Sequence, residues 1–267
     1  MTSSPTPGAL LARLRDEKPL VHCITNYVAM NIAANVLLAA GASPAMVHAE
    51  EEAGEFAGIA AALTVNIGTL SPHWAEGMRG AARTARASGR PWVLDPVAHF
   101  ATGFRRGVTA ELVALSPAVI RGNASEIIAL AGEASRGAGM DSGDPVAAAE
   151  EAARTLARGH GTVVAVTGET DFVTDGERVA RIAGGSALMS QVTALGCSLT
   201  ALTGAFAAVS PGDAFEASIA ALALFAVAGG RAERLAEGPG SFGWRFLDAL
   251  AAVDPGTLDA EARIARA

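Results

Sequence analysis

Short runs of β-branched and other apolar residues alternate with alanine- and leucine-rich stretches along most of this chain. A short apolar run is typical of a buried strand, and the longer stretches fit helices that join one parallel strand to the next. The pattern predicts strands over Leu20–Ile24, Pro44–Val47, Leu63–Asn66, Trp92–Leu94, Ala118–Ile120 and Thr162–Val166. It predicts helices over Gly8–Asp16, Val28–Ala40, Glu51–Ala60, His73–Ser88, Ala124–Ala131, Pro145–Arg158, Cys197–Val209, Asp213–Leu235 and Phe242–Ala251. The sequence therefore predicts an α/β fold around a mostly parallel sheet.

A hairpin and a loop interrupt this alternation in the second half of the chain. The pair Asp175-Gly176 lies between two alternating runs that extend from Asp171 to Ile182, which is typical of a hairpin and predicts an antiparallel edge. The stretch Gly132–Asp144 is rich in glycine and serine and indicates a loop. Since no repeat or linker is evident, residues 1–267 are predicted to form a single domain, with residues 1–7 as a flexible N-terminal segment.

The balance of charges argues against a nucleic-acid or membrane partner. The chain has 20 Lys and Arg against 27 Asp and Glu, a net charge of −7, so it lacks a basic excess for either surface. The polar start Met1–Gly8 does not resemble a signal peptide, and the apolar segment Ala217–Gly230 is shorter than the roughly 20 residues that cross a bilayer. We expect a cytoplasmic protein in which Cys23 and Cys197 are free thiols.

Polar residues follow nearly every predicted strand at the point where the strand ends. They are Thr25-Asn26, Asn66-Ile-Gly-Thr69, Asp95, Arg121-Gly-Asn123 and Thr167-Gly-Glu169. Ligands of open α/β sheets bind beyond the carboxyl ends of the strands, so these groups are expected on one rim of the sheet.

Several of these residues suit the transfer of a phosphoryl group. Carboxylates such as Asp95 and Glu126 suit Mg²⁺, which binds few protein ligands and bridges nucleotide phosphates. The alternative is that Asp95 caps a turn while Glu126 completes a capping box with Asn123. Arg121 has the donor geometry for phosphate oxygens, although a surface ion pair is the other interpretation. Thr167 offers a hydroxyl beside a glycine turn, which is a weak signal by itself.

Cys197, directly after Gly196, lies at the predicted start of a helix. A helix start gathers unpaired N–H groups, which hold a phosphate and lower the pKa of a thiol. The thiolate could then act as a weak base toward a hydroxyl, whereas a lone cysteine is more often a small buried apolar residue. The histidines lack the close spacing of zinc ligands, and Met46 alone indicates only packing.

Taken in order along the chain, five segments resemble the hydroxyethylthiazole kinase family. They are Val21-His-Cys-Ile-Thr-Asn-Tyr-Val28, Leu94-Asp-Pro-Val97, Arg121-Gly-Asn-Ala-Ser-Glu-Ile127, Thr167-Gly-Glu-Thr-Asp-Phe-Val-Thr-Asp-Gly176 and Gly196-Cys197. The resemblance covers roughly residues 8–250. It implies a ribokinase-like three-layer sandwich with helices on both faces of the sheet. It also implies a homotrimeric transferase that uses Mg²⁺ and ATP to phosphorylate the hydroxyl of 4-methyl-5-(2-hydroxyethyl)thiazole, in the salvage of the thiazole half of thiamine.

The resemblance also implies roles for individual residues. Met46, Ala194 and Asn26 would bind the substrate, with Asn26 near a subunit contact, and Gly196 and Cys197 would form the catalytic turn that receives the phosphoryl group. The ATP-binding residues would be Arg121, Thr167 and Asn123, and the metal-binding residues Asp95 and Glu126.

Two departures from the family pattern lie at this rim. The family usually has Thr-Gly-Thr-Gly-Cys in the catalytic turn, whereas this chain has Ala194 and Leu195 in place of the first glycine and the second threonine. If the turn needs a positive φ at Ala194, the substitution costs about 1 kcal/mol. After Asp-Pro-Val the family tends to have Gly-Ala-Gly, where this chain has Ala98-His99-Phe100. Two alternatives therefore stay open: a related small-alcohol kinase with an altered pocket, and a non-catalytic sensor of thiazole or nucleotide.

Overall fold

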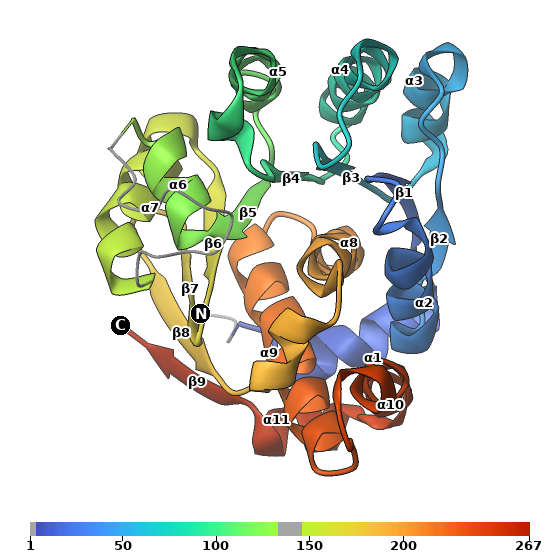
Figure 1. Ribbon diagram of the computed structural model, residues 1–267, viewed down its shortest axis with the longest axis vertical. Coiled ribbons are helices and arrows are strands. Elements are labelled where there is room, and N and C mark those ends of the chain that lie inside the picture. Colours follow the sequence, from blue (N-terminus) through green and yellow to red (C-terminus); the bar gives the residue numbers. More distant parts are fainter. Residues whose placement is uncertain (1–3, 133–145) are drawn as a thin grey trace.

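The structure, a computed structural model, describes residues 4–132 and 146–267 of the chain. Nine strands lie in these residues: β1 (Leu20–Ile24), β2 (Ser43–Ala45), β3 (Ala62–Asn66), β4 (Trp92–Asp95), β5 (Val119–Asn123), β6 (Val163–Thr167), β7 (Thr170–Thr174), β8 (Val179–Ala183) and β9 (Arg263–Arg266). They form one sheet in the order β2-β1-β3-β4-β5-β6-β7-β8-β9 (Figure 1). Pairing is parallel from β2 to β6 across the sheet and antiparallel from β6 to β9. The predicted mostly parallel sheet with an antiparallel hairpin is confirmed.

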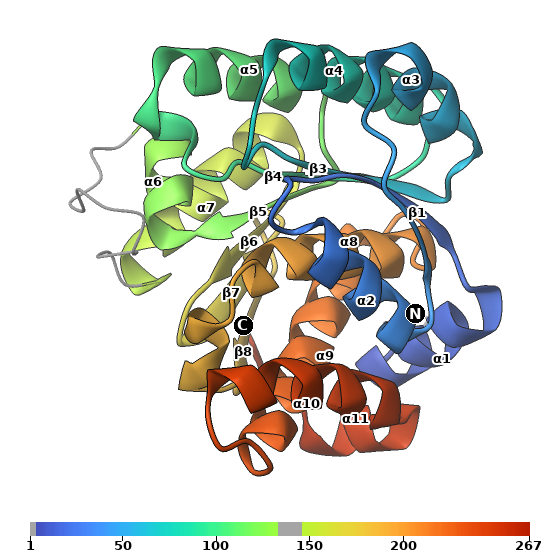
Figure 2. The ribbon, with the colours of Figure 1, turned by 45° about the vertical axis from the view of Figure 1, so that its right-hand side comes forward.

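Helices cover both faces of this sheet. The α-helices in the described residues are α1 (Pro7–Glu17), α2 (Met30–Ala40), α3 (Glu50–Ile59), α4 (Pro72–Ala87), α5 (Gly103–Val113), α6 (Ala124–Leu130), α7 (Val146–His160), α8 (Leu195–Ala208), α9 (Ala214–Glu233), α10 (Pro239–Ala252) and α11 (Pro255–Glu261). Short 3₁₀ helices η1 (His99–Ala101) and η2 (Ala187–Gln191) precede α5 and α8. In Figure 2, α3, α4 and α5 lie on one side of the sheet, and α1, α2, α8, α9 and α10 lie on the other. The predicted three-layer sandwich is confirmed.

Alternating strand residues supply the two apolar layers of the core. In β6, Val163 and Ala165 pack into the cluster with α8 and α9, while Val164 and Val166 pack into the cluster with α4 and α7. Successive side chains of a strand point to opposite faces, so a strand between two helical layers must be apolar on both. This explains why the central strands are continuous apolar runs.

The structure corrects several predicted boundaries. The strand predicted to end at Ile120 continues to Asn123, because Arg121, Gly122 and Asn123 pair with β6. Helix α8 begins at Leu195, two residues before Cys197. Helices α5 and α11 and strand β9 were not predicted. The predicted loop Gly132–Asp144 and the predicted helix start at Pro145 lie, except for Gly132, outside the described residues.

The N-terminal segment differs from expectation, whereas the long apolar helix α9 agrees with it. Residues 1–3 lie outside the described part, but Thr6 caps α1 and Pro7 is its first residue, so these two are not a flexible end. Helix α9, with 20 residues, is the one described helix long and apolar enough to cross a membrane by length and composition. In this fold 78% of its most apolar 18-residue stretch is buried, which agrees with the prediction of a buried helix.

The parallel register brings the polar strand ends together. Asn66 at the end of β3 pairs with Asp95 at the end of β4, and Asn123 of β5 pairs with Thr167 of β6. Carboxyl ends of parallel strands share one edge of a sheet, so the predicted rim is a property of this topology.

Candidate active site

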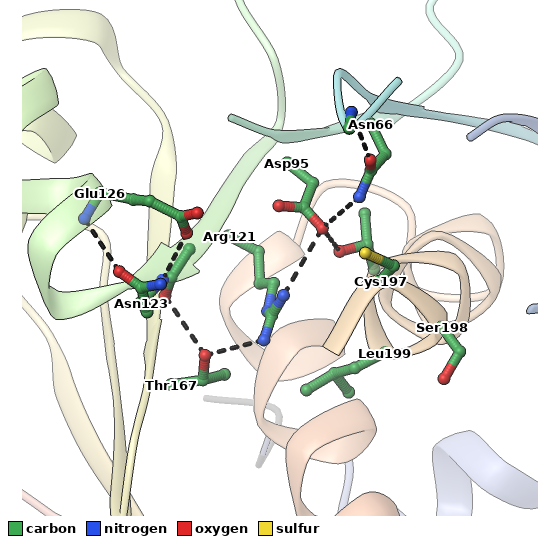
Figure 3. A network of polar contacts seen from close by, with 12 residues as sticks. Asn66, Asp95, Arg121, Asn123, Glu126, Thr167, Cys197, Ser198 and Leu199 are labelled. Carbon is green, nitrogen blue, oxygen red and sulfur yellow. Dashed lines mark hydrogen bonds and ion pairs between the residues drawn. The ribbon is translucent and has the colours of Figure 1, made fainter. Parts of the chain in front are cut away.

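Asp95 lies at the centre of the polar network on this rim. Its carboxylate is 1% exposed, and Oδ2 accepts hydrogen bonds from Asn66 Nδ2 and Thr200 Oγ1, each at 2.7 Å, with Arg121 Nη1 at 3.5 Å (Figure 3). Burial raises the pKa of Asp95, and Arg121, Thr200 and Asn66 oppose that increase. Oδ1 is buried and has no hydrogen-bond partner in the described residues. One oxygen of the carboxylate is therefore held by side chains, and the other is free to bind a ligand.

Arg121, on β5, connects Asp95 at the end of β4 to Thr167 at the end of β6. Its Nη2 donates to Thr167 Oγ1 at 2.7 Å, and Thr167 Oγ1 also donates to Gly122 O at 3.4 Å (Figure 3). The Arg121 residue is 8% exposed, so the alternative of a surface ion pair is wrong. Its buried Nε has no partner among the described residues. A buried guanidinium with a free N–H is suited to an incoming anion.

Glu126 serves the local structure and also faces the site. The predicted capping box is present, because Asn123 Oδ1 accepts from the Glu126 N–H and Glu126 Oε2 accepts from the Asn123 N–H, both at 2.9 Å. Its other oxygen, Oε1, accepts from the Ala98 N–H at 2.9 Å. Burial, with the nearby Asp95 charge adding to it, raises the pKa of Glu126 to about 7.

The start of α8 presents its first turn to the same site. Ala194 precedes the helix in a left-handed conformation with φ of 61°, so the positive φ that the sequence left conditional is present. The expectation that the helix start lowers the thiol pKa of Cys197 is wrong. Burial, together with the Asp95 charge, raises the pKa of Cys197 to about 11, which makes it a neutral thiol at pH 7. Its Sγ lies 3.4 Å from Asn26 Nδ2, which donates to it.

Two cavities meet at Arg121 and Gly196. The first, of about 280 Å³, is lined by Asp95, Val97, Ala98, Phe100, Arg121, Asn123, Ser125, Glu126, Ala194, Gly196 and Cys197. The second, of about 690 Å³, is lined by Arg121, Thr167, Gly168, Glu169, Asp171, Gly184, Gly185, Ser186, Ala187, Met189, Ser190, Leu195, Gly196, Leu199, Phe225, Ala226 and Glu233. We refer to these as the small and the large cavity. The large cavity has room for a nucleotide, and the small cavity holds the carboxylates.

The residues of the small cavity fit Mg²⁺ bound together with phosphate. Within residues 4–132 and 146–267, no group of three or more His, Cys, Asp or Glu side chains is arranged to hold a metal ion alone. Mg²⁺ usually keeps several waters and takes one or two carboxylates plus substrate phosphates. The free Oδ1 of Asp95, with Glu126 lining the same cavity, matches that donor set.

Two predicted substrate residues have other contacts in this chain. Asn26 is 5% exposed, and its Nδ2 donates to Asn66 Oδ1 at 2.9 Å while its Oδ1 caps the turn by accepting from the Ala29 N–H. Met46 is half-buried against the core and lines neither cavity. Of the predicted site residues, those on the strand ends and at the start of α8 come together, and Met46 does not join them.

Sequence reasoning missed the roles of Asn66 and Thr200. Asn66 was noticed only as one of the polar strand ends, but it contacts Asp95 directly. Thr200 lies three residues after Cys197, so both occupy one face of α8, and that spacing was the available signal.

The fold is the one that ribokinase-like kinases share. A pyridoxal kinase from Staphylococcus aureus, solved with AMP-PCP and pyridoxal, superposes with a TM-score of 0.59 at 18% identity, covering 79% of this chain and 88% of that one, which shows a shared fold.

Closer relatives identify the family. The model of the hydroxyethylthiazole kinase family matches residues 11–255. A hydroxyethylthiazole kinase of Rhizobium johnstonii is 69% identical over 267 residues and all of both chains, and one of Cereibacter sphaeroides is 65% identical over 96% of this chain and 97% of its own. The solved hydroxyethylthiazole kinase protein of Pyrococcus horikoshii has a TM-score of 0.89 at 40% identity, covering 98% of each chain. The chain belongs to the hydroxyethylthiazole kinase family.

Proposed function

We propose that this chain transfers the γ-phosphoryl group of ATP to the hydroxyl of 4-methyl-5-(2-hydroxyethyl)thiazole, in thiamine salvage. The observation that carries the proposal is the junction of the two cavities at Arg121 and Gly196. A nucleotide in the large cavity would direct its phosphates past the guanidinium toward Asp95, Glu126 and the start of α8. Family membership supplies the substrate class.

Each group has a defined task in this transfer. The hydroxyl oxygen of the substrate forms a bond to the γ-phosphorus and releases its proton to solvent, while the bond to the β–γ bridging oxygen breaks and ADP leaves. Arg121 and Thr167 would hold phosphate oxygens, and Asn123, which lines the small cavity, would contact the phosphates from that side. The first-turn N–H groups of α8 at Gly196 and Cys197 have no helical partner and point toward the incoming charge.

Mg²⁺ held by Asp95 and Glu126 would supply neutralisation of charge on the phosphates. Without a cation, these two carboxyls face each other's charge, and that repulsion adds to the increase in the pKa of Glu126. Burial and the Asp95 charge raise the pKa of Cys197 to about 11, so without a bound cation its thiol is neutral at pH 7. A loose transition state needs little help from a base, so positioning accounts for most of the catalysis.

The predicted roles of Met46 and Asn26 toward the thiazole depend on a homotrimer, which we also propose. Large apolar side chains are exposed around α2, with Tyr27 at 66%, Val28 at 57% and Leu38 at 61%. Such a surface suits a contact between subunits, where a second chain would complete the thiazole site. Size-exclusion chromatography with light scattering tests the homotrimer, since the mass of a monomer would contradict it. We also propose that the protein is located in the cytoplasm.

Four purified proteins test the proposed chemistry: wild type, Arg121→Ala, Cys197→Ala and a control variant. With Mg-ATP and the thiazole alcohol, the wild type should release ADP in step with phosphorylated product. Arg121→Ala should lose about 10³-fold in kcat/KM, as for other cations at phosphoryl transfer, and Cys197→Ala much less. Arg13→Ala, an exposed arginine on α1, is the matched control. Equal activity in all four proteins would contradict the assignment.

Phe100 supports a second candidate, a related small-alcohol kinase with a changed pocket. It lines the small cavity, in the segment where the family tends to have Gly-Ala-Gly. A panel of hydroxyalkyl heterocycles, compared by kcat/KM in the wild type and in Phe100→Gly, separates the two. A better substrate than the thiazole alcohol would favour the second candidate.

A further inference from the structure

Arg105 binds two loops at the rim of the sheet from outside the site. It lies in the first turn of α5, where Thr102 caps the helix, and its side chain is half-buried. Its Nη1 donates to Ile67 O at 2.8 Å and to Val97 O at 2.9 Å, and its Nη2 donates to Gly68 O. A single guanidinium therefore satisfies carbonyls from the loop after β3 and from the loop after β4.

These two loops carry the polar residues that surround Asp95. Ile67 and Gly68 directly follow Asn66, and the Gly68 N–H donates to Asn66 Oδ1 at 2.9 Å. Val97 lies two residues after Asp95, and Asn66 Nδ2 donates to Asp95 Oδ2 (Figure 3). Fixing the loops relative to each other therefore fixes the amide against the carboxylate.

Arg105 is also connected to Glu126, through Ala98, the residue that follows Val97 in the loop after β4. Ala98 has φ of 46°, a left-handed conformation that alanine adopts only at an energetic cost. Its N–H donates to Glu126 Oε1 at 2.9 Å. The peptide that carries this N–H begins with the Val97 carbonyl that Arg105 holds. Loss of that hold would let Ala98 relax and turn its N–H away from Glu126.

We propose that Arg105 is a positioning residue for the pair Asp95 and Glu126, acting through the Val97 carbonyl and the Asn66 loop. The inference rests on the proposed function, because it concerns the carboxylates assigned to Mg²⁺. Residues that orient metal ligands from outside typically change metal affinity or activity by about 10- to 100-fold when they are replaced. Arg105 touches neither cavity, so its effect must pass through the two loops.

Arg105→Met and Arg105→Lys, with Arg15→Met as control, form the test. Arg15 is also half-buried and also donates to three carbonyls, those of Ala40, Leu250 and Ala251, but these lie at helix ends away from the site. Methionine keeps the length of the side chain and removes every donor. Lysine keeps one ammonium, which cannot reproduce the planar fork, so its effect should be smaller.

Three quantities are measured on each protein: kcat/KM, the Mg²⁺ concentration at half-maximal rate, and affinity for a non-hydrolysable ATP analogue with and without Mg²⁺. For Arg105→Met we expect kcat/KM to fall by about 10- to 100-fold. Analogue affinity should fall only when Mg²⁺ is present, and the Mg²⁺ requirement should rise. Arg15→Met should lose thermal stability by a similar amount and keep wild-type values of all three.

The proposal is overturned if Arg105→Met behaves as Arg15→Met does. If neither Arg105 variant folds, amide hydrogen exchange on the wild type decides, because the proposal requires the Gly68 and Ala98 amides to be as protected as those of the central strands. Fast exchange at both would overturn it. An inactive wild type would instead contradict the proposed function, and the Mg²⁺-dependent analogue affinity would still test Arg105.

Discussion

Residue 194, directly before α8, is an alanine in a backbone conformation that favours glycine. Its φ is 61° and its ψ is 12°. In this region Cβ approaches the following carbonyl oxygen, which costs roughly 1–2 kcal/mol for an ordinary residue. Ala194→Gly should therefore stabilise the protein, whereas glycine in place of alanine usually does the opposite.

The expected gain is the difference between two opposing effects. Removing Cβ releases the strain of about 1–2 kcal/mol. Glycine makes the unfolded chain more flexible, which returns about 0.4–1 kcal/mol. Ala194 is half-buried, so little packing is lost, and glycine is a better residue than alanine at the cap of a helix. We expect a net stabilisation of about 0.5–1 kcal/mol, or about 1–4 °C in Tm for a chain of this size.

Urea unfolding of three proteins checks this prediction: wild type, Ala194→Gly and Ala12→Gly. Ala12 is exposed in the middle of α1, where glycine should destabilise the helix by about 1 kcal/mol. The two substitutions are chemically identical, so only backbone conformation can give them opposite signs. A loss of stability in Ala194→Gly equal to that in Ala12→Gly would refute the reasoning.

Three further predictions concern single polar contacts. Burial raises the pKa of Asp171 from 3.8 to about 6. Ionisation of this carboxyl therefore destabilises the folded state as pH rises through that range. The increase in Tm caused by Asp171→Asn should be near zero at pH 4 and largest above pH 6. Thr200→Val should lose about 1.5–3 kcal/mol in urea unfolding because it removes a donor to a carboxylate, whereas Thr203→Val removes only a bond to a carbonyl of its own helix, and equal losses would contradict this. Arg266→Met should lose about 2–3 kcal/mol because it strands the buried Glu216 carboxylate, and adding Glu216→Gln should recover much of that loss, which calorimetry would show.

The fold could be predicted where local pattern and tertiary structure agree. Strands β1, β3 and β6 are mostly apolar because both of their faces are covered, so the pattern alone located them to within a residue. Strand β9 has the sequence Arg-Ile-Ala-Arg and is mostly exposed, so its pairing with β8 gives no apolar signal. Helix α5 contains Gly103 and Gly107, which weaken helix propensity, and its cap Thr102 was the signal that went unused.

The site could be predicted only in part, since its contacts join distant parts of the sequence. Strand ends gather on one rim in any parallel sheet, so Asp95, Arg121 and Thr167 were found from order alone. Thr200 lies 105 residues from its partner Asp95, and no local pattern connects them. The predicted direction of the pKa shift at Cys197 was wrong, because burial and the charge of Asp95 outweigh the lowering effect of the helix start. Neither burial nor this charge is visible in the local sequence.

Gly196 separates the two cavities without a side chain of its own. A Cβ at this position would lie 3.3 Å from Arg121 Nη2 and 3.4 Å from Nη1, too close unless the guanidinium moved. Displacing that guanidinium would also disturb its bonds to Asp95 and Thr167. A side chain at residue 196 would thus shift, by a few tenths of an ångström, a guanidinium that lines both cavities. The start of α8 and the Arg121 side chain are therefore coupled, and a larger residue at position 196 requires an adjustment of the arginine.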